Sequence, residues 1–416
     1  MKYSKRVLAI AAGVVCASLL GCGGSSGGGS GGFLGLPPSS SSGGATQGPG
    51  ASNPPPPAPP EDPLKGAPEF ARMTWFGITN WHYQIGDKGV LLDGEVVNSG
   101  RDANPAAVTK ALDALVASPV PPLGKDADAA SKLSVDVILL GHIHPDHSVQ
   151  LPEWAKQTGK MVYAPPAECA TLVSKGIPAE QCVGLKGGEV IKLGEFASVR
   201  AVRWVHSVDC DEYSNGTGGP ETFGFLFTVK TRSGKVLSWY TSDSGAGGPD
   251  LTTPRKVTTV DGQGVSTTTT YGSPLANLKS AIKDAGLDGF DIWQGGPESR
   301  MVYQARTVIP AFGVKTFMPH HLNSRAANGQ SFALTYGMHY AYSVDDQPKL
   351  KELLSTLDVP QIYPTNYFDA WVYDKDGVRP VDNAAMKAVY GLPAQGAGPG
   401  QQYPNPRAGS LECPAD

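Results

Sequence analysis

Apolar and polar residues alternate along this chain with two periods, and the periods predict its secondary structure between about residue 72 and residue 375. Short runs rich in Val, Ile, Phe, Tyr and Trp, bounded by Gly, Asp and Asn, are typical of strands. Between these runs, apolar residues recur every three or four positions, as in helices that cover a sheet. The alternation predicts an α/β protein built of layered sheets and helices.

The individual elements follow from the same pattern. Strands are predicted over 73–96 (two or three of them), 135–141, 160–165, 197–206, 221–231, 235–243, 290–296 and 314–321. Helices are predicted over 105–118, 151–158, 166–176, 274–287, 298–312 and 348–358, and the last of these completes the domain. The Gly-, Thr- and Val-rich stretch 245–272 is predicted to be an inserted loop or hairpin with little core of its own.

The run 135–141, VDVILLG, is continuously apolar, which is typical of a strand buried on both faces. It leads directly into HIHPDH, residues 142–147, in a chain that has only eight histidines. Layered α/β proteins bind ligands just beyond the carboxyl ends of their strands. Four ligand-type side chains in six positions therefore predict a site for two metals. Neutral imidazoles suit zinc, and a carboxylate adds charge for a second ion.

The segment HIHPDH resembles the HxHxDH signature of the metallo-β-lactamase superfamily. This resemblance implies a four-layer αββα sandwich and further ligands in a fixed order: a histidine, an aspartate and a last histidine, each after a later strand. His206 in RWVHSVD, Asp243 in WYTSDSG, and His320 or His321 in FMPHHLN stand in that order. The lactonase and phospholipase D-like branches often show Pro-x-His at the last ligand, which favours His321 over His320.

The resemblance implies one set of ligands for each of two zinc ions. His142, His144 and His206 hold the first ion, Asp146, His147 and the last histidine hold the second, and Asp243 bridges both. A hydroxide shared by two such ions is a nucleophile near neutral pH. Asp146 is the expected catalytic residue, because it can orient the hydroxide and move its proton.

The expected function is hydrolysis of an ester, lactone or phosphodiester bond. A glutamate in place of His144 would have pointed to di-iron redox chemistry in this superfamily. Two alternatives stay open: a mononuclear iron enzyme like the sulfur dioxygenases, which also carry HxHxDH, or a non-catalytic surface binding lipoprotein. Long loops after His206 and Asp243 shape the pocket, so the substrate does not follow from the resemblance.

The N-terminus predicts export. Residues 1–21 have a basic start and an apolar stretch, as in a secretory signal peptide, and Leu-Leu-Gly-Cys resembles the bacterial lipobox, which implies lipidation at Cys22. The alternative is an ordinary cleaved signal that leaves Cys22 as a free thiol. Residues 22–66, rich in Gly, Ser and Pro, are predicted to be an unfolded tether. The hydrolase domain is expected over 67–391 and an extended tail over 392–416.

These features predict a bacterial lipoprotein of the periplasm or cell surface, held to a membrane through its lipid. Gly23 follows the lipid cysteine instead of the aspartate that retains enteric lipoproteins at the inner membrane, so the outer membrane is favoured. The net charge is only −4 and no Lys/Arg cluster lies beyond the signal, which argues against a nucleic-acid partner. A small-molecule or lipid-like substrate is expected.

Four cysteines remain beyond the signal and the anchor, and an even count in an exported protein suggests disulfides. The preferred pairing, one of three, joins Cys169 to Cys182 and Cys210 to Cys413. No CxxC spacing exists, which argues against a cysteine zinc site.

Several other residues have two interpretations. His82 and Trp81 either border the pocket or pack within a strand, and His339 either lines the cleft or is an ordinary surface or core histidine. Tyr240, Thr241 and Ser242 are expected to fix the geometry of Asp243, Trp204 and Trp293 to lie in the core, and Asn215 to stand in a turn although it begins a glycosylation sequon.

Overall fold

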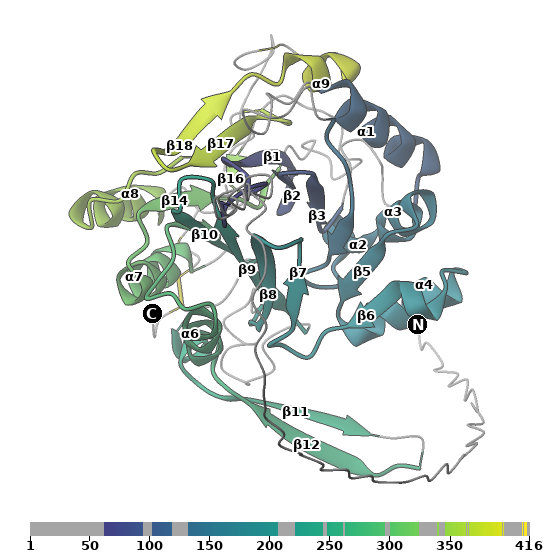
Figure 1. The fold of residues 1–416 in the computed structure, drawn as a ribbon. Helices are drawn as coiled ribbons and strands as arrows, with labels where there is room; N and C mark the ends of the chain where they lie inside the picture. Colours follow the sequence, from purple (N-terminus) through teal and green to yellow (C-terminus); the bar gives the residue numbers. More distant parts are fainter. Residues whose placement is uncertain are drawn as a thin grey trace, which may run out of the picture. The chain divides into compact units, whose positions relative to one another are not determined.

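The computed structural model describes residues 62–94, 102–118, 132–206, 221–243, 248–260, 263–295, 300–323, 339–340, 346–362, 364, 366–392, 394, 410 and 412–413 (Figure 1). The predicted signal peptide, Cys22, most of the tether and tail, Cys210 and Asn215 lie outside these residues. Among the helices that are described, none combines the length and the apolar character needed to cross a membrane.

The first sheet has eight strands in the order β18-β17-β1-β2-β3-β4-β5-β6. Their bounds are β1 Ala71–Gly77, β2 Asn80–Ile85, β3 Lys88–Leu92, β4 Val137–Leu139, β5 Met161–Ala164, β6 Cys182–Gly184, β17 Ala370–Asp374 and β18 Gly377–Val381. Strands β3 to β6 run parallel, whereas the other neighbours are antiparallel. The carboxyl end of β4 therefore opens on the same edge as its parallel neighbours.

The second sheet has six strands in the order β14-β13-β10-β9-β8-β7. Their bounds are β7 Val190–Lys192, β8 Ala197–Arg203, β9 Phe223–Lys230, β10 Val236–Thr241, β13 Ile292–Gly295 and β14 Thr316–Pro319. Strands β10, β13 and β14 are parallel, and β8 points the same way because both β8 and β10 pair antiparallel with β9. Four strands thus end at one edge of this sheet.

The two sheets pack face to face through aromatic side chains. Tyr83 of β2 lies with its ring centroid 4.7 Å from Phe227 of β9 and 5.5 Å from Trp239 of β10. Alternate residues of β2 point to the opposite face, where His82 contacts Ser134. Both faces of β2 are covered, which explains why all of its residues are buried although its sequence alternates in polarity.

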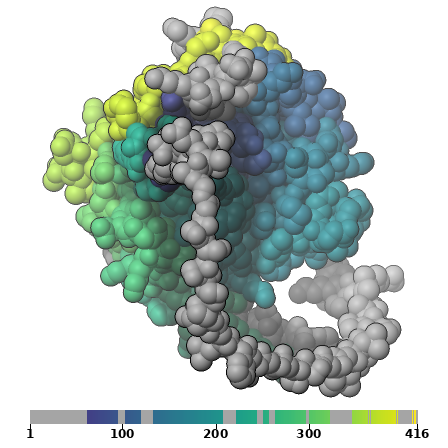
Figure 2. All heavy atoms as spheres, viewed as in Figure 1, coloured from purple at the N-terminus to yellow at the C-terminus, as the bar shows by residue number. Residues whose placement is uncertain are grey.

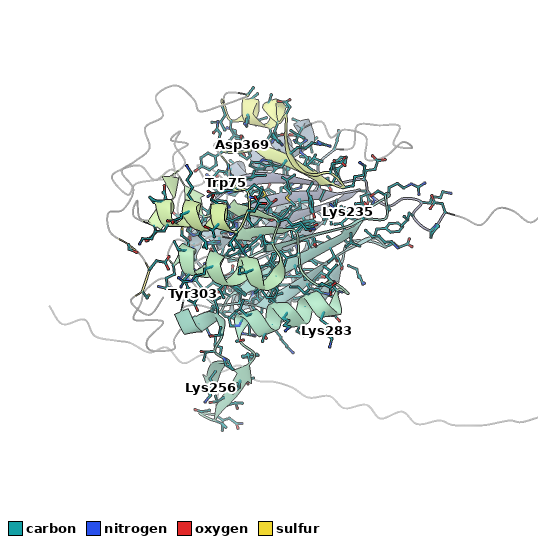
Figure 3. The ribbon with its side chains drawn as sticks, turned by 90° about the vertical axis from the view of Figure 1, so that its left-hand side faces the viewer. Trp75, Lys235, Lys256, Lys283, Tyr303 and Asp369 are labelled. Atoms are coloured by element: carbon teal, nitrogen blue, oxygen red, sulfur yellow. A yellow bond between two sulfur atoms is a disulfide. The ribbon has the colours of Figure 1, made fainter. Side chains whose placement is uncertain are left out.

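Helices cover the outer face of each sheet. The first sheet carries α1 Pro105–Ala117, α3 Leu151–Thr158, α4 Pro166–Ser174 and α9 Ala384–Val389, and α9 lies beside α1 (Figures 1 and 2). The second sheet carries α6 Pro274–Asp284, α7 Met301–Phe312 and α8 Asp346–Thr356. Figure 3 faces this second layer, with Lys283 on α6 and Tyr303 on α7. The predicted α/β fold with four αββα layers is confirmed.

The helix predicted over 348–358 forms, as α8, but it does not complete the domain. The chain continues into β17, β18 and α9, and β17 pairs with β1 inside the first sheet. The backbone N–H of Trp75 donates to the carbonyl of Asp369, 3.0 Å away, and Figure 3 shows the two residues close together. These short elements lie among Pro, Asn, Asp and Gly, which concealed them in the sequence pattern.

The predicted insertion is a hairpin, β11 Arg255–Val260 and β12 Ser266–Tyr271, which form a two-stranded sheet of their own. Most of β12 is exposed, as expected of a segment with little core. Other short elements were not predicted either: β6, β7, α2 Pro145–Ser148, β15 Leu322–Asn323, β16 His339–Tyr340 and the 3-10 turns Ala179–Gln181 and Gly248–Leu251.

One predicted disulfide is confirmed, because Cys169 in α4 is bonded to Cys182 at the start of β6. Cys413 is also disulfide-bonded. Its predicted partner, Cys210, lies outside the described residues.

Candidate metal centre

The HIHPDH segment changes backbone conformation halfway along, from extended at His144 to helical from Pro145. His144 is extended (φ −64°, ψ 145°) and caps α2, which begins at Pro145. Proline suits the first position of a helix because its missing N–H would have no partner there. His142 and His144 therefore lie in the loop between β4 and α2, whereas Asp146 and His147 lie in the helical turn itself.

Three more side chains reach the same place from the second sheet. His206 follows β8, Asp243 follows β10 and His321 follows β14, and these strands end at one edge of their sheet. Lys235, labelled in Figure 3, lies just before β10 begins and so marks the opposite end of that strand. His321 has a left-handed backbone (φ +59°), and its N–H donates to the carbonyl of Ile78.

The structure brings all seven predicted ligands together in three overlapping groups. His142, His144 and His206 form one, His142, His147 and Asp243 a second, and Asp146, His147 and His321 a third. Within each group the candidate ligand atoms lie within 4.8 Å of one another. The first and third groups match the two ligand sets that the sequence implied.

Asp243 stands between the two sets. Its Oδ2 atom lies 3.1 Å from His142 Nε2, 3.2 Å from His206 Nε2 and 3.9 Å from His147 Nε2. Asp146 lies beside the other two histidines: its Oδ1 is 3.7 Å from His147 Nε2, and its Oδ2 is 3.7 Å from His321 Nε2. A carboxylate shared by both sets is the arrangement that a bridging ligand requires.

Electrostatic interactions in this cluster are strong because most of its members are fully buried. Burial and the neighbouring charge of His147 hold the pKa of His142 well below its usual value. Burial disfavours ionisation of Asp243, but His142 and His147 outweigh it and hold its pKa well below the usual range. Burial likewise opposes the charge on His147, yet Asp146, Asp243 and Asp93 raise its pKa to about 10.

The donor set fits a divalent cation. Nε2 of His142 and of His147 are buried and have no hydrogen-bond partner among the described residues, although both point toward carboxylates. Unpaired buried nitrogens are costly unless another group satisfies them. Two or three imidazoles with a carboxylate are a common zinc set, and a bound ion would displace the proton from His147 Nε2.

Sequence reasoning missed Asp93, which directly follows β3 and is buried. Its Oδ1 accepts a hydrogen bond from the N–H of Gly141 at 2.8 Å, and its Oδ2 lies 2.8 Å from His147 Nδ1. The hydroxyl of Thr79 donates to the same Oδ2 and lies 2.6 Å from His147 Nδ1. The available signal was an Asp-Gly pair at a strand end, which reads equally well as a turn.

His320 and His321 have different surroundings. His320 Nε2 lies 2.6 Å from the carbonyl oxygen of Ser242, and Trp81 Nε1 donates to His320 Nδ1 at 3.2 Å. Both ring nitrogens of His320 therefore have protein partners, and burial lowers its pKa to about 4. The structure places His321, and not His320, in a ligand group. Trp81 contributes by holding His320.

The weaker candidates differ in where they lie. Ser242 supports the turn that carries Asp243, since its carbonyl contacts His320 and its hydroxyl accepts a hydrogen bond from Trp293. Tyr240 and Thr241 belong to β10, and the side chains of Trp204 and Trp293 are buried in the core beneath α6 and α7. His339 lies in β16, which pairs with the residues just after His321.

His82 packs within the sheet, away from the ligand groups: it stacks on Phe76 and its Nε2 lies 2.6 Å from the carbonyl oxygen of Ser134. Burial lowers the pKa of His82 to about 4. The folded state therefore binds fewer protons than the unfolded state below the ordinary histidine pKa of about 6.5, and stability is lost as pH falls from there toward 4.

We expect His82→Gln to remove part of this pH dependence. Urea unfolding measures the free energy of unfolding of each protein at pH 7 and at pH 5. The decrease from pH 7 to pH 5 should be about 2 kcal/mol larger in the unmodified protein than in the variant. Comparing the two proteins cancels the titration of the metal ligands. Equal drops would contradict the buried, neutral state of His82.

A cavity of about 330 Å³ lies elsewhere, lined by Lys186, Arg200, Arg203, Tyr271, Asn277 and other residues. None of the seven clustered side chains lines it. Both of its arginines are engaged in ion pairs, Arg200 with Asp284 and Arg203 with Glu221.

The chain matches no known protein-family model and no curated protein sequence. Its fold is similar to that of several solved structures. A metallo hydrolase from Ignicoccus hospitalis, Igni18, shares 13 % identity with a TM-score of 0.40, covering 73 % of this chain and 98 % of that one. The metallo-β-lactamase fold protein YhfI from Bacillus subtilis shares 11 % identity with a TM-score of 0.40, covering 73 % of this chain and 99 % of that one. An isothiocyanate hydrolase from Delia radicum gut bacteria shares 13 % identity with a TM-score of 0.39, covering 72 % of this chain and 98 % of that one.

Proposed function

We propose that this protein is a metal-dependent hydrolase that holds two zinc ions and cleaves an ester, lactone or phosphodiester bond. The observation that carries the proposal is the clustering of seven ligand-type side chains from both sheets, in which Oδ2 of Asp243 lies within 3.9 Å of Nε2 of His142, His147 and His206. His142, His144 and His206 would hold one ion and Asp146, His147 and His321 the other. Two adjacent divalent ions supply a water of lowered pKa as the nucleophile and neutralise charge that develops on the substrate.

Asp146 is the residue we assign to proton transfer. Burial opposes its ionisation, but His147 and His321 keep its pKa below the usual value, so it is a carboxylate near neutral pH. Its side chain remains 20 % exposed, whereas that of Asp243 is 3 % exposed. Asp146 can therefore accept a proton from an incoming water and return it to the leaving oxygen.

The substrate approaches from the side of the HIHPDH loop. Ile143, between the two first-set histidines, is 41 % exposed, and His144 is only partly buried. The remaining site histidines are almost fully buried. An apolar residue at the rim suits a substrate with an apolar portion beside the scissile bond, in line with the lipid-like class that membrane tethering favours.

Elemental analysis of the full mature chain, paired with turnover of a chromogenic phosphodiester and a chromogenic ester, tests the proposal. We expect close to two zinc per chain, turnover of at least one substrate, and loss of both metal and turnover after chelation. One iron and no hydrolysis would instead support the dioxygenase alternative. Absence of metal would leave a binding lipoprotein.

We further propose that the chain is exported and lipidated at Cys22. The amino-acid pattern of residues 1–22 supports this proposal. In a bacterial host, the protein should partition into the detergent phase of a Triton X-114 extraction, and mass spectrometry should find acyl chains on Cys22. Cys22→Ala should remain unprocessed and unacylated. Recovery of the unmodified chain in the aqueous phase, cleaved but without lipid, would contradict lipidation.

A further inference from the structure

The turn that joins β1 to β2 forms hydrogen bonds with all three members of one proposed ligand set. The carbonyl of Ile78 accepts the N–H of His321 at 2.9 Å, and Asn80 Nδ2 donates to the carbonyl of Asp146 at 3.4 Å. Thr79 Oγ1 lies 2.6 Å from His147 Nδ1. Asp146, His147 and His321 are together the second set.

The turn is held in a conformation that few residues adopt freely. Ile78 has a φ of +51°, in the left-handed region that is costly for a β-branched side chain. Its carbonyl oxygen is fixed by two donors, Trp75 Nε1 and the N–H of His321, each at 2.9 Å. Asn80 Nδ2 also donates to the carbonyl of Gly77 at 2.8 Å. These contacts make the position of Thr79 rigid.

The hydrogen bonds around Thr79 define which nitrogen of His147 carries a proton. The Thr79 hydroxyl donates to Asp93 Oδ2, so its oxygen is free to accept. His147 Nδ1 lies within hydrogen-bond distance of two acceptors, Thr79 Oγ1 and Asp93 Oδ2, which fixes a proton on Nδ1. The lone pair of a neutral His147 is then on Nε2, which faces Asp146 and Asp243.

The first set lacks this support within the described part of the chain. Nδ1 of His142 and Nδ1 of His206 are buried without a hydrogen-bond partner there. Partners that orient a metal-binding histidine raise metal affinity, and removing one typically lowers affinity about 10- to 100-fold. An orienting contact on His147 alone would act on the second ion and leave the first ion unaffected.

We propose that Thr79 is a positioning residue that promotes binding of the second metal ion and not of the first. It does so by fixing the tautomer and ring orientation of His147. This inference rests on the proposed binuclear site. Thr79 acts through His147 and does not touch the ion itself. Asp93 differs from Thr79 because it also binds the N–H of Gly141, directly before His142, and so supports both sets.

The test compares Thr79→Val, which keeps the shape and removes the hydroxyl, with Thr79→Ser, which keeps the hydroxyl. Zinc is titrated into the metal-free full chain against a chromophoric chelator, so that the two binding steps are resolved. We expect Thr79→Val to weaken one step about 10- to 100-fold with the other unchanged, and Thr79→Ser to restore both steps to within a few-fold. Cobalt(II) spectra should show loss of one of two ligand-field signatures.

The possible failures are distinguishable. If the unmodified chain binds two ions and Thr79→Val weakens both steps equally, or neither, the positioning role of Thr79 is overturned and the binuclear site stands. If the unmodified chain binds fewer than two ions, the proposed function and this inference both fail. Circular dichroism of the metal-free variants monitors folding, and Thr79→Ala serves as a second hydroxyl deletion if the valine variant does not fold.

Discussion

We expect replacement of Asp243 by alanine to lower turnover by about 10³-fold or more and to remove zinc from both proposed positions, because catalysis by adjacent ions depends on holding them together. Asp243 Oδ2 lies within 3.9 Å of Nε2 of His142, His147 and His206. Its carboxylate therefore lies against histidines of both proposed sets. Without its negative charge, two divalent ions would repel each other across a buried site that offers little solvent screening.

The same substitution also changes the metal-free protein. Asp243 is one of three carboxylates that raise the pKa of His147 to about 10, so its removal leaves a buried imidazolium with less compensation. Breaking a buried charge pair from one side costs about 3–5 kcal/mol. Urea unfolding of the metal-free chain measures this loss, while elemental analysis and kcat measure the loss of function.

Asp284→Ala is the matched control, since Asp284 ends α6, its side chain is 62 % exposed and it pairs with Arg200. It should retain zinc, turnover and most of its stability, because exposed ion pairs contribute at most about 1 kcal/mol. Asp243→Asn provides a second test if the alanine variant does not fold. Two zinc ions and unchanged kcat in either Asp243 variant would exclude a bridging role.

The candidate ligands could be predicted because each segment that carries them begins within a few residues of the end of a strand that the apolar pattern reveals. His142 follows β4, His206 follows β8 and Asp243 follows β10. The dense HIHPDH segment supplied the resemblance, and the resemblance supplied the order of the later ligands. Local sequence was sufficient where a ligand and the strand that positions it are neighbours in the chain.

The supporting residues could not be predicted, because their partners are distant in sequence. Thr79 and His147 are separated by 68 positions, and Trp81 and His320 by 239. A threonine in a turn and a tryptophan in a strand carry no sign of these contacts. The same reason explains why β17 was not predicted. It pairs with β1, which lies at the other end of the domain's sequence, and a strand's preference depends on such distant neighbours.

Asp93→Asn should weaken zinc binding at both proposed positions about 10- to 100-fold, in contrast to the single step expected for Thr79→Val. Asp93 is only 2 % exposed. Its Oδ1 accepts a hydrogen bond from the N–H of Gly141, and its Oδ2 accepts one from Nδ1–H of His147. An asparagine amide must present its NH₂ group to one of these donors. In either orientation of the amide, its NH₂ group faces another buried donor, the N–H of Gly141 or Nδ1–H of His147.

The cost of facing donors is about 1–3 kcal/mol for neutral groups and more where a charge is involved, so the metal-free variant should also unfold more readily in urea. Asp136→Asn is the matched control: Asp136 precedes β4, at the end remote from HIHPDH, and accepts from Gly89 N–H at 3.0 Å and Ser134 Oγ at 2.6 Å. That variant can lose stability but should keep both zinc affinities. Unchanged affinities in Asp93→Asn would show that the ions alone orient His147 and the loop before His142.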